Sequence, residues 1–385
     1  MRKKPMQYGI LFLSILLLSS PSLPAQDLVS QQKEISKKNV AEIKSRIDIL
    51  RKDIITKNKK YRVDITEMMK YKISQITGAK VPVAIDSEAK VQGSIGNRMF
   101  IEYLKRMQKE NRKYGGYLKD KYDIEDSGNS ENPDDAEKKD TAPIADTNDA
   151  STDESTADTK PNPAATAFSW LDNNKMTPVK YQGICGSCWT FTSAAVFEGS
   201  VNMNYGQILD LSEQNILDCS KNKAGRKAGS CDGGWYGHVF EYYMNNNLVL
   251  ENQNPYLGKN QLCKKVSFAD YRIAAWGYIK PDAGIPSVKE MKEAICKYGP
   301  IAACVKVTEP FQAYVGGIYD EHAKTSGPRD INHAITIVGW DDAKKAYLIK
   351  NSWGTEWGEN GYMWIEYGFN NIGYGAAWVV VEKTE

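Results

Sequence analysis

The feature that most constrains the fold is the uneven distribution of cysteine and tryptophan. All seven cysteines and all nine tryptophans lie after residue 165, whereas residues 125–160 contain no aromatic residue and are rich in Asp, Glu, Ser, Thr, Asn and Ala. A segment of that composition buries too little apolar surface to offset the entropy cost of ordering it. The sequence therefore predicts a folded domain at residues 166–385, preceded by an acidic disordered linker at residues 125–165.

Residues 1–25 have the pattern of a cleavable signal peptide. A short basic stretch is followed by an apolar run at residues 9–18 and by a small, proline-containing stretch that ends at Ala25. The run is shorter than the roughly 20 apolar residues that a membrane-spanning helix needs. We expect a secreted protein without a stable membrane span, in a setting where disulfides persist; an uncleaved anchor is the alternative.

Residues 26–124 are basic and have a helical pattern. One apolar stripe with alternating spacings of three and four is formed by Val40, Ile43, Ile47, Leu50 and Ile54. The stripe loses its register at Lys57, so it is too short to indicate a long coiled coil. A second amphipathic helix is predicted from about residue 99 to residue 117.

A candidate nucleophile lies within the run Gln-Gly-Ile-Cys-Gly-Ser-Cys-Trp at residues 182–189. The residues that follow are apolar on one side and free of proline, which predicts a helix starting near Ser187, a good N-cap residue. The thiol of Cys188 would then lie at the positive end of the helix dipole, which favours the thiolate.

Two polar residues further along the chain complete a pattern suited to thiol acyl transfer. His333 opens an apolar strand, and Asn351 follows a second strand. An unperturbed thiol has a pKa of about 8.5, so an adjacent imidazolium is needed to stabilise its thiolate and later to protonate the leaving amine. An amide oxygen can hold that imidazole in one tautomer. The side-chain amide of Gln182 and the backbone N–H of Cys188 would stabilise the oxyanion.

Other interpretations of these residues are weaker. Cys185 and Cys188 form a C-x-x-C pair, which occurs in zinc sites and redox pairs. The chain has only three histidines and no second C-x-x-C pair, so we expect neither a metal nor another cofactor. His238 and His322 have no comparable context and are interpreted as structural or surface residues. A net charge of +2 gives no basis for predicting a nucleic-acid partner.

Three stretches resemble the papain and cathepsin family of cysteine peptidases, in the order and rough spacing of that family: residues 168–189, 332–340 and 351–362. The resemblance covers roughly residues 166–380. It implies an α+β fold with two subdomains, a helical one beginning at Ser187 and a β-barrel-like one from about Ala275, with the active-site cleft between them.

The resemblance also implies roles for individual residues. Cys188 is the expected nucleophile, His333 the general base and acid, and Asn351 the acceptor of an imidazole hydrogen bond. Gln182 would line the oxyanion hole, and Trp353 would shield the imidazole–amide bond from water. The expected substrate-binding residues are Gly233, Gly234, Trp235, Tyr236, Ile331 and Ala334. Because the side chains of that pocket are apolar, we expect a preference for an apolar residue second before the scissile bond. The sequence has no clear extra loop that would block one end of the cleft, so we expect an endopeptidase rather than an exopeptidase.

The cysteine pattern fits the same family. The resemblance implies disulfides between Cys185 and Cys231 and between Cys219 and Cys263. Cys296 and Cys304 either form a third disulfide or remain as two buried thiols.

The N-terminal region departs from the family. Cathepsin propeptides carry an interleaved helix motif, of which Glu42 and Arg46 keep the first spacing, whereas Leu50, Asp53 and Lys57 do not continue it. Residues 26–124 are therefore either an inhibitory propeptide or an accessory docking module.

Three functions remain open: a peptidase, a catalytically silent binding protein of the same fold, and a peptide ligase that uses the same acyl-enzyme. The expected partners are protein or peptide substrates and the chain's own N-terminal segment, in a monomer.

Overall fold

The computed structural model describes residues 25–109 and 161–384. The predicted signal peptide before Ala25, the predicted linker up to residue 160 and the last part of the second predicted helix lie outside these ranges. None of the helices within the two ranges combines the length and the apolar character that crossing a membrane requires. Residues up to Ser45 and residues from Arg46 onward form separate compact units, and all packing described below lies within the second unit.

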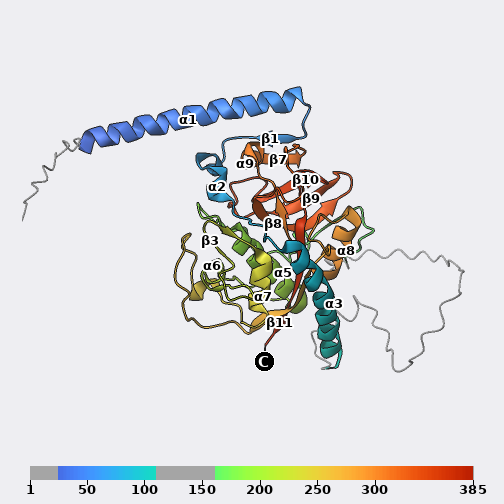
Figure 1. Cartoon of the computed structure of the whole chain (residues 1–385). Helices are drawn as coiled ribbons and strands as arrows, with labels where there is room; N and C mark the ends of the chain where they lie inside the picture. Colours follow the sequence, from blue (N-terminus) through green and yellow to red (C-terminus); the bar gives the residue numbers. More distant parts are fainter. Residues whose placement is uncertain (1–24, 110–160, 385) are drawn as a thin grey trace, which may run out of the picture. The chain divides into compact units, whose positions relative to one another are not determined.

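The N-terminal region is mainly helical (Figure 1). Its elements are α1 (Ala25–Thr56), β1 (Tyr61–Val63), η1 (Glu67–Lys70), α2 (Ile73–Ile76) and α3 (Ile85–Lys109). Helix α1 ends next to Lys57, where the predicted stripe loses its register. Helix α3 begins well before residue 99, where the second helix was expected. The buried face of its first turns includes Ala89 and Gln92, which are short or polar and leave no apolar pattern in the sequence.

The second described range contains helices and strands in mixed order. The helices are α5 (Cys188–Tyr205), α6 (Glu213–Cys219), α7 (Tyr236–Tyr243), η2 (Glu251–Gln253), α8 (Val288–Tyr298) and α9 (Glu309–Gln312). The strands are β2 (Ala167–Ser169), β3 (Gly229–Ser230), β4 (Gly233–Gly234), β5 (Tyr271–Tyr278), β6 (Ile301–Val305), β7 (Tyr314–Tyr319), β8 (His333–Asp341), β9 (Ala346–Lys350), β10 (Tyr362–Glu366) and β11 (Tyr374–Lys383).

One sheet dominates the described strands. It has nine strands in the order β1-β7-β10-β9-β8-β6-β11-β5, with β2 paired to β8. Most neighbours are antiparallel; β10 and β7 are parallel. Strand β1 of the N-terminal region is thus hydrogen-bonded to β7, with Tyr61 opposite Gly317. This strand pairing ties the N-terminal region to the sheet.

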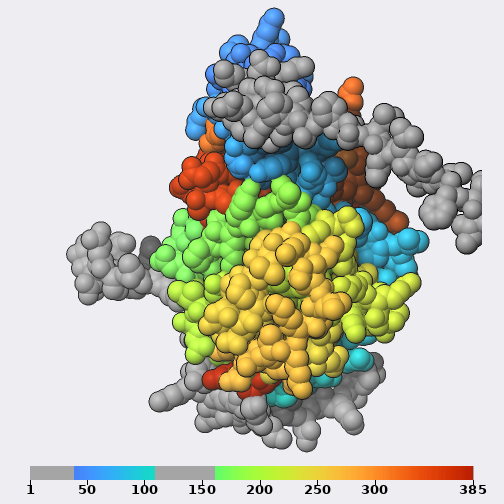
Figure 2. Space-filling view, turned by 90° about the vertical axis from the view of Figure 1, so that its left-hand side faces the viewer, coloured from blue at the N-terminus to red at the C-terminus, as the bar shows by residue number. Residues whose placement is uncertain are grey.

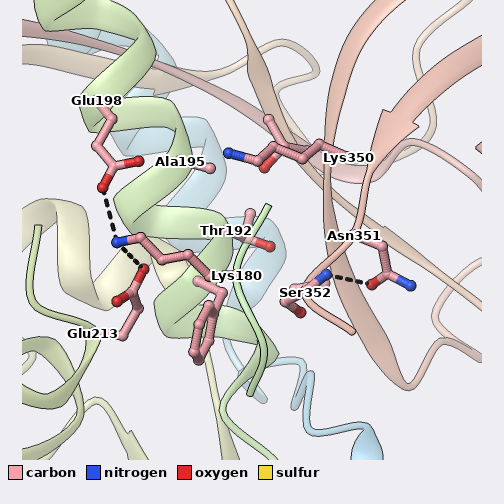
Figure 3. Close-up of a pocket in the computed structure, with 11 residues that line it drawn as sticks. Lys180, Thr192, Ala195, Glu198, Glu213, Lys350, Asn351 and Ser352 are labelled. Atoms are coloured by element: carbon pink, nitrogen blue, oxygen red, sulfur yellow. Dashed lines mark hydrogen bonds and ion pairs between the residues drawn. The ribbon is translucent and has the colours of Figure 1, made fainter. Parts of the chain in front are cut away.

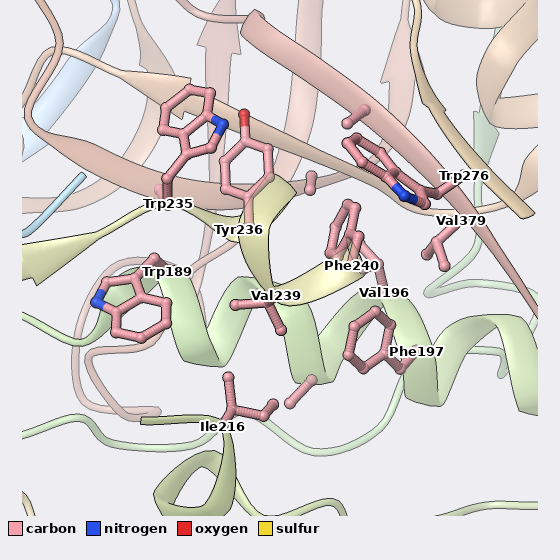
Figure 4. Packing of buried hydrophobic residues seen from close by; sticks show 14 of the residues in the cluster. Trp189, Val196, Phe197, Ile216, Trp235, Tyr236, Val239, Phe240, Trp276 and Val379 are labelled. Carbon is pink, nitrogen blue, oxygen red and sulfur yellow. The ribbon is translucent and has the colours of Figure 1, made fainter. Parts of the chain in front are cut away.

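Helix α5 forms the centre of the helical part. Every residue from Cys188 to Met203 is buried, so the helix is surrounded by protein on all sides. Figure 4 shows Trp189, Val196 and Phe197 of α5 packed among aromatic side chains that come from α7 and β5. A buried helix of this kind holds its first residue in a fixed position, and that residue is Cys188. The α+β architecture with a helical and a sheet part is confirmed.

The cysteines divide into two groups. Disulfides join Cys185 to Cys231 and Cys219 to Cys263, the pairs implied by the family resemblance. Cys296 and Cys304 form no disulfide with each other, and both are buried thiols. The alternative of two buried thiols, left open by the sequence, is the one that the structure adopts.

Candidate active site

Cys188 is the first residue of α5, directly after Ser187. Ser187 stands at the N-cap position as predicted, but its side chain makes no capping hydrogen bond. Its hydroxyl instead lies 2.6 Å from that of Tyr256, which also donates to the backbone oxygen of Gln182. The serine therefore ties the loop before the nucleophile to the Tyr256 region, and the expected capping interaction is corrected.

His333 and Asn351 lie side by side at the ends of neighbouring strands. His333 is the first residue of β8, and Asn351 directly follows β9. Strands β8 and β9 are antiparallel neighbours in the sheet. His333 Nε2 is 2.8 Å from Asn351 Oδ1, which also accepts a hydrogen bond from the backbone N–H of Ser352. Because an amide oxygen only accepts, Nε2 carries the proton and Nδ1 is left as the basic nitrogen.

The nucleophile lies next to the same strand. The backbone N–H of Ala334 points at Cys188 Sγ over 3.4 Å. Within the described residues, His333 Nδ1 has no hydrogen-bond partner. The sulfur is thus held by backbone groups in this state, while the imidazole nitrogen that could accept its proton is unoccupied.

Trp353 covers the imidazole. The two ring centroids are 4.9 Å apart, and the indole is buried. Its Nε1 donates to the backbone oxygen of Ile76 over 3.2 Å. The indole therefore lies over the imidazole and also contacts the N-terminal region, which the sequence did not indicate. Its role in shielding the imidazole–amide bond of His333 stays a prediction.

Gln182 is held by a residue that the sequence analysis missed. The hydroxyl of Ser352 donates to Gln182 Oε1 over 2.6 Å, which turns the amide nitrogen toward the nucleophile loop. That nitrogen donates to the oxygens of Cys185, at 2.8 Å, and Ile76, at 3.2 Å. A carbonyl of the N-terminal region thus occupies the donor with which Gln182 would bind a substrate oxyanion.

Residues 76–80, here called the crossing segment, run over the candidate site. Gly234 donates through its N–H to the oxygen of Gly78 (2.8 Å) and accepts from the N–H of Lys80 (3.0 Å). The N–H of Ala79 donates to the oxygen of Asn332 over 2.9 Å. In the space-filling view, the light-blue part of the N-terminal region lies directly against the green residues that open the helical part (Figure 2).

The expected substrate-binding residues are brought together but are covered. Gly233, Gly234, Trp235, Tyr236, Ile331 and Ala334 are all buried. The hydroxyl of Tyr236 donates to Gly375, and the indole of Trp235 donates to Tyr278. Ala79 and Ile85 pack in the same apolar cluster as this group. Aliphatic residues of the chain's own N-terminal region therefore belong to the same buried cluster as the expected pocket residues, and the substrate-binding role of those residues stays a prediction.

Burial keeps both reactive groups neutral in this state. It raises the pKa of the Cys188 thiol to about 11, although backbone hydrogen bonds from Ala334 and Gly78 act in the opposite direction. Burial also lowers the pKa of His333 to about 4, against the effect of its bond to Asn351. A thiolate–imidazolium pair is disfavoured while the crossing segment is in place.

A buried ionic cluster lies behind the site (Figure 3). Lys180 Nζ is 3.1 Å from Glu198 Oε1 and 2.9 Å from Glu213 Oε1. Burial would lower the pKa of Lys180, but the carboxylates of Glu198, Glu213 and Asp210 together outweigh it and raise that pKa. Burial lowers the pKa of Lys350, the residue before Asn351, to about 8.

A small cavity of about 20 Å³ separates this cluster from Asn351 and Ser352. It is large enough for one water molecule. The sequence analysis did not single out these charged residues, because they are far apart in the chain and charged residues are normally exposed.

The described residues contain no group of three or more His, Cys, Asp or Glu side chains arranged to bind a metal ion.

Comparisons with known proteins place the chain in a family. A family model described as papain family cysteine protease matches residues 164–380. The chain is 34% identical over 220 residues to pro-cathepsin H of Mus musculus, covering 56% of this chain and 64% of that protein. It is 37% identical over 206 residues to cathepsin K of Gallus gallus, covering 52% and 58%. The chain thus spans about three fifths of the length of these curated relatives.

The fold is also similar to that of a solved precursor. The structure of digestive procathepsin L 3 from the Tenebrio molitor larval midgut matches with a TM-score of 0.58 at 21% identity, covering 94% of both chains. The structural match covers 94% of this chain, whereas the family model matches residues 164–380 alone. The similarity in fold therefore includes part of the N-terminal region.

Proposed function

Because this chain belongs to the papain family of cysteine proteases, we propose that it is a secreted cysteine endopeptidase whose N-terminal region closes its own active site. Cys188 is the nucleophile of this proposal, His333 the general base and acid, and Asn351 the residue that orients the imidazole. Residues 26–124 contain the propeptide, and the other interpretation, an accessory docking module, is the alternative to be tested.

The contact that carries the proposal is the 2.8 Å bond between His333 Nε2 and Asn351 Oδ1. It leaves Nδ1 as the only ring nitrogen able to exchange a proton with a thiol. The residue next to His333 already contacts Cys188 Sγ through its N–H. In the proposed enzyme, the thiol turns from the N–H of Ala334 toward Nδ1 to complete the pair.

The reaction follows from these groups. In the open enzyme, proton transfer from Cys188 to His333 Nδ1 gives a thiolate, which adds to the scissile carbonyl. The N–H of Cys188 and the amide of Gln182 hold the oxyanion. The imidazolium then protonates the leaving amine, so that a thioester and the first product remain. Water, deprotonated by the imidazole, hydrolyses the thioester and restores the thiol.

The crossing segment supports the propeptide role. It uses two groups that a substrate would need, the Gln182 amide and the backbone of Gly234, and its Ala79 packs in the apolar cluster that contains the expected pocket residues. Its bridge at Gly234 is parallel rather than antiparallel. Ala79 and Ile85 pack in the apolar cluster that contains the expected pocket residues, which supports a preference for an apolar residue second before the scissile bond.

The test is covalent labelling by a thiol-directed epoxysuccinyl inhibitor, with the full chain compared before and after the N-terminal region is removed by limited proteolysis. We expect labelling at Cys188 only after removal, together with hydrolysis of peptides that carry an apolar residue at the second position. Cys188→Ala is the control. Equal labelling before and after removal would contradict the closing role, and no labelling in either state would contradict the peptidase. Formation of an amide with an added amine would instead favour the ligase.

A further inference from the structure

The residues matched by the papain-family model, 164–380, are here called the peptidase part. Helix α3 follows the crossing segment and packs along one face of this part. Its buried residues recur about once per turn: Ile85, Ala89, Gln92, Gly96, Phe100 and Tyr103. This spacing places them in one stripe along the helix. The stripe continues far beyond the cleft, so most of α3 cannot act by blocking substrate directly.

The stripe covers the last strand of the sheet. Strand β5 stands at the end of the strand order in the described residues, paired on one side with β11. The side-chain amide of Gln92 donates to the backbone oxygen of Trp276, in the middle of β5, over 2.8 Å. An uncovered edge strand presents unpaired backbone groups. Helix α3 therefore covers this edge and supplies a partner for one of its backbone oxygens.

A glycine makes the close approach to β5 possible. A Cβ built on Gly96 would overlap the backbone oxygen of Trp276. One helical turn earlier, a Cβ on Gly93 would meet no atom within 4 Å. The two glycines share the same helix and differ only in what they face, so Gly96 is required by the docking and Gly93 is not.

Aromatic and ionic contacts fix the distal half of the helix. The Phe100 ring lies 5.1 Å from that of Tyr298 and 5.9 Å from that of Trp378, which stack on each other at 3.9 Å. Arg106 forms an ion pair of 2.7 Å with Glu382 of β11. None of these contacts involves the cleft.

We propose that the face formed by β5, α8 and the end of β11 is a helix-binding surface of the peptidase, distinct from its cleft. Its occupant is α3 of the same chain. The linker between the crossing segment and α3 is short and consists of residues 81–84. A docked α3 therefore keeps the crossing segment at a high effective concentration over the cleft. A cut within residues 110–160 therefore does not open the site, because α3 stays bound through its own contacts. The consequence for activity rests on the proposed function, whereas the docking does not.

The experiment compares Gly96→Ala with Gly93→Ala in the full chain, by hydrogen exchange measured by mass spectrometry. Both substitutions raise helix propensity by the same amount. We expect Gly96→Ala to speed exchange in α3 and at the amides of Ala79 and Lys80 by roughly tenfold or more, because local opening sets these rates. Gly93→Ala should leave exchange unchanged or slow it.

Two results would overturn the proposal. One is equal exchange rates in the two variants. The other is faster exchange in α3 but an unchanged rate at Ala79 and Lys80, which would show that α3 does not hold the crossing segment. If Gly96→Ala does not fold, Phe100→Ala replaces it, with the exposed neighbour Ile101→Ala as its control. Exchange does not require catalysis, so a chain that shows the expected exchange but no hydrolysis would refute the proposed function and leave the docking intact.

A second measurement follows the cut chain. After a site-specific protease site is placed within residues 110–160 and cleaved, the N-terminal fragment should elute with the peptidase part on gel filtration. In the Gly96→Ala chain it should separate. Separation of the fragment from the otherwise unchanged chain would contradict retention by α3.

Discussion

Gly78 lies directly against Gly186, two positions before the nucleophile. A Cβ on Gly78 would overlap the backbone oxygen of Gly186, and a Cβ on Gly186 would lie 2.8 Å from the oxygen of Thr77. Two chain segments that are far apart in sequence thus meet backbone to backbone, with no side chain between them. This contact brings the N–H of Gly78 to the sulfur of Cys188.

Gly78→Ala should open the site. The obstructing atom belongs to the backbone of a disulfide-bonded loop, so it cannot move aside at low cost. We expect labelling of Cys188 in the full chain to become at least about tenfold faster. This corresponds to a loss of about 1.4 kcal/mol in the free energy that favours the closed state over the open one. Gly93→Ala serves as the matched control, because its methyl group meets no neighbour. Equal labelling rates in the two variants would contradict this role of Gly78.

The stability of the closed chain should fall in acid. The pKa of His333 is lowered from 6.5 to about 4 by burial. When the chain unfolds, the imidazole takes up a proton near pH 6.5, whereas the folded chain resists protonation until about pH 4. The contribution of His333 is therefore fully present above pH 6.5 and is lost as the pH falls through this window, by up to about 3 kcal/mol.

Urea unfolding at several pH values between 7 and 4 measures this effect. His333→Gln is the control, since a glutamine does not titrate. The free energy of unfolding should decline more steeply in the unchanged chain than in the variant. Parallel declines would show that His333 does not contribute to the acid sensitivity.

The catalytic residues of the peptidase part could be predicted from the sequence because each lies in a short, recognisable sequence motif. Cys188 precedes a helix, His333 opens a strand and Asn351 follows one, so each element fixes the residue at its end. Neighbouring antiparallel strands then bring His333 and Asn351 together. The fold of this part follows from the same motifs.

The crossing segment could not be predicted in the same way. Gly78 and Ala79 act through backbone N–H and C=O groups, which every residue carries, so no side-chain pattern marks them. The hydroxyl of Ser187 was expected to cap a helix, but a tertiary partner, Tyr256, lies within its reach. Local rules describe what a residue can do, and packing decides which of these options is used.

Gln182→Ala should slow catalysis without weakening substrate binding. The amide would stabilise charge that appears only in the transition state, so kcat should fall on the order of 100-fold with little change in KM. The comparison is made in a Gly78→Ala background, in which the crossing segment no longer competes for the amide. A change confined to KM would mean that Gln182 binds the substrate rather than the oxyanion.

The buried ionic cluster behind the site should contribute strongly to stability. Glu198 and Asp210 both contact Lys180, at 3.1 Å and 2.7 Å, but their side chains are 1% and 68% exposed. Glu198 also accepts hydrogen bonds from Thr177 and from the N–H of Leu211. Its removal leaves several buried donors without an acceptor, whereas removal of Asp210 frees groups that water can reach.

Glu198→Ala should therefore lower the free energy of unfolding by about 3–5 kcal/mol. Asp210→Ala, which deletes a carboxylate from the same lysine, should lower it by no more than about 1 kcal/mol. Urea titration of both full-length variants followed by tryptophan fluorescence makes the comparison, since tryptophans lie only in the peptidase part. Similar losses in the two variants would mean that the charge on Lys180, rather than burial of Glu198, determines the cost.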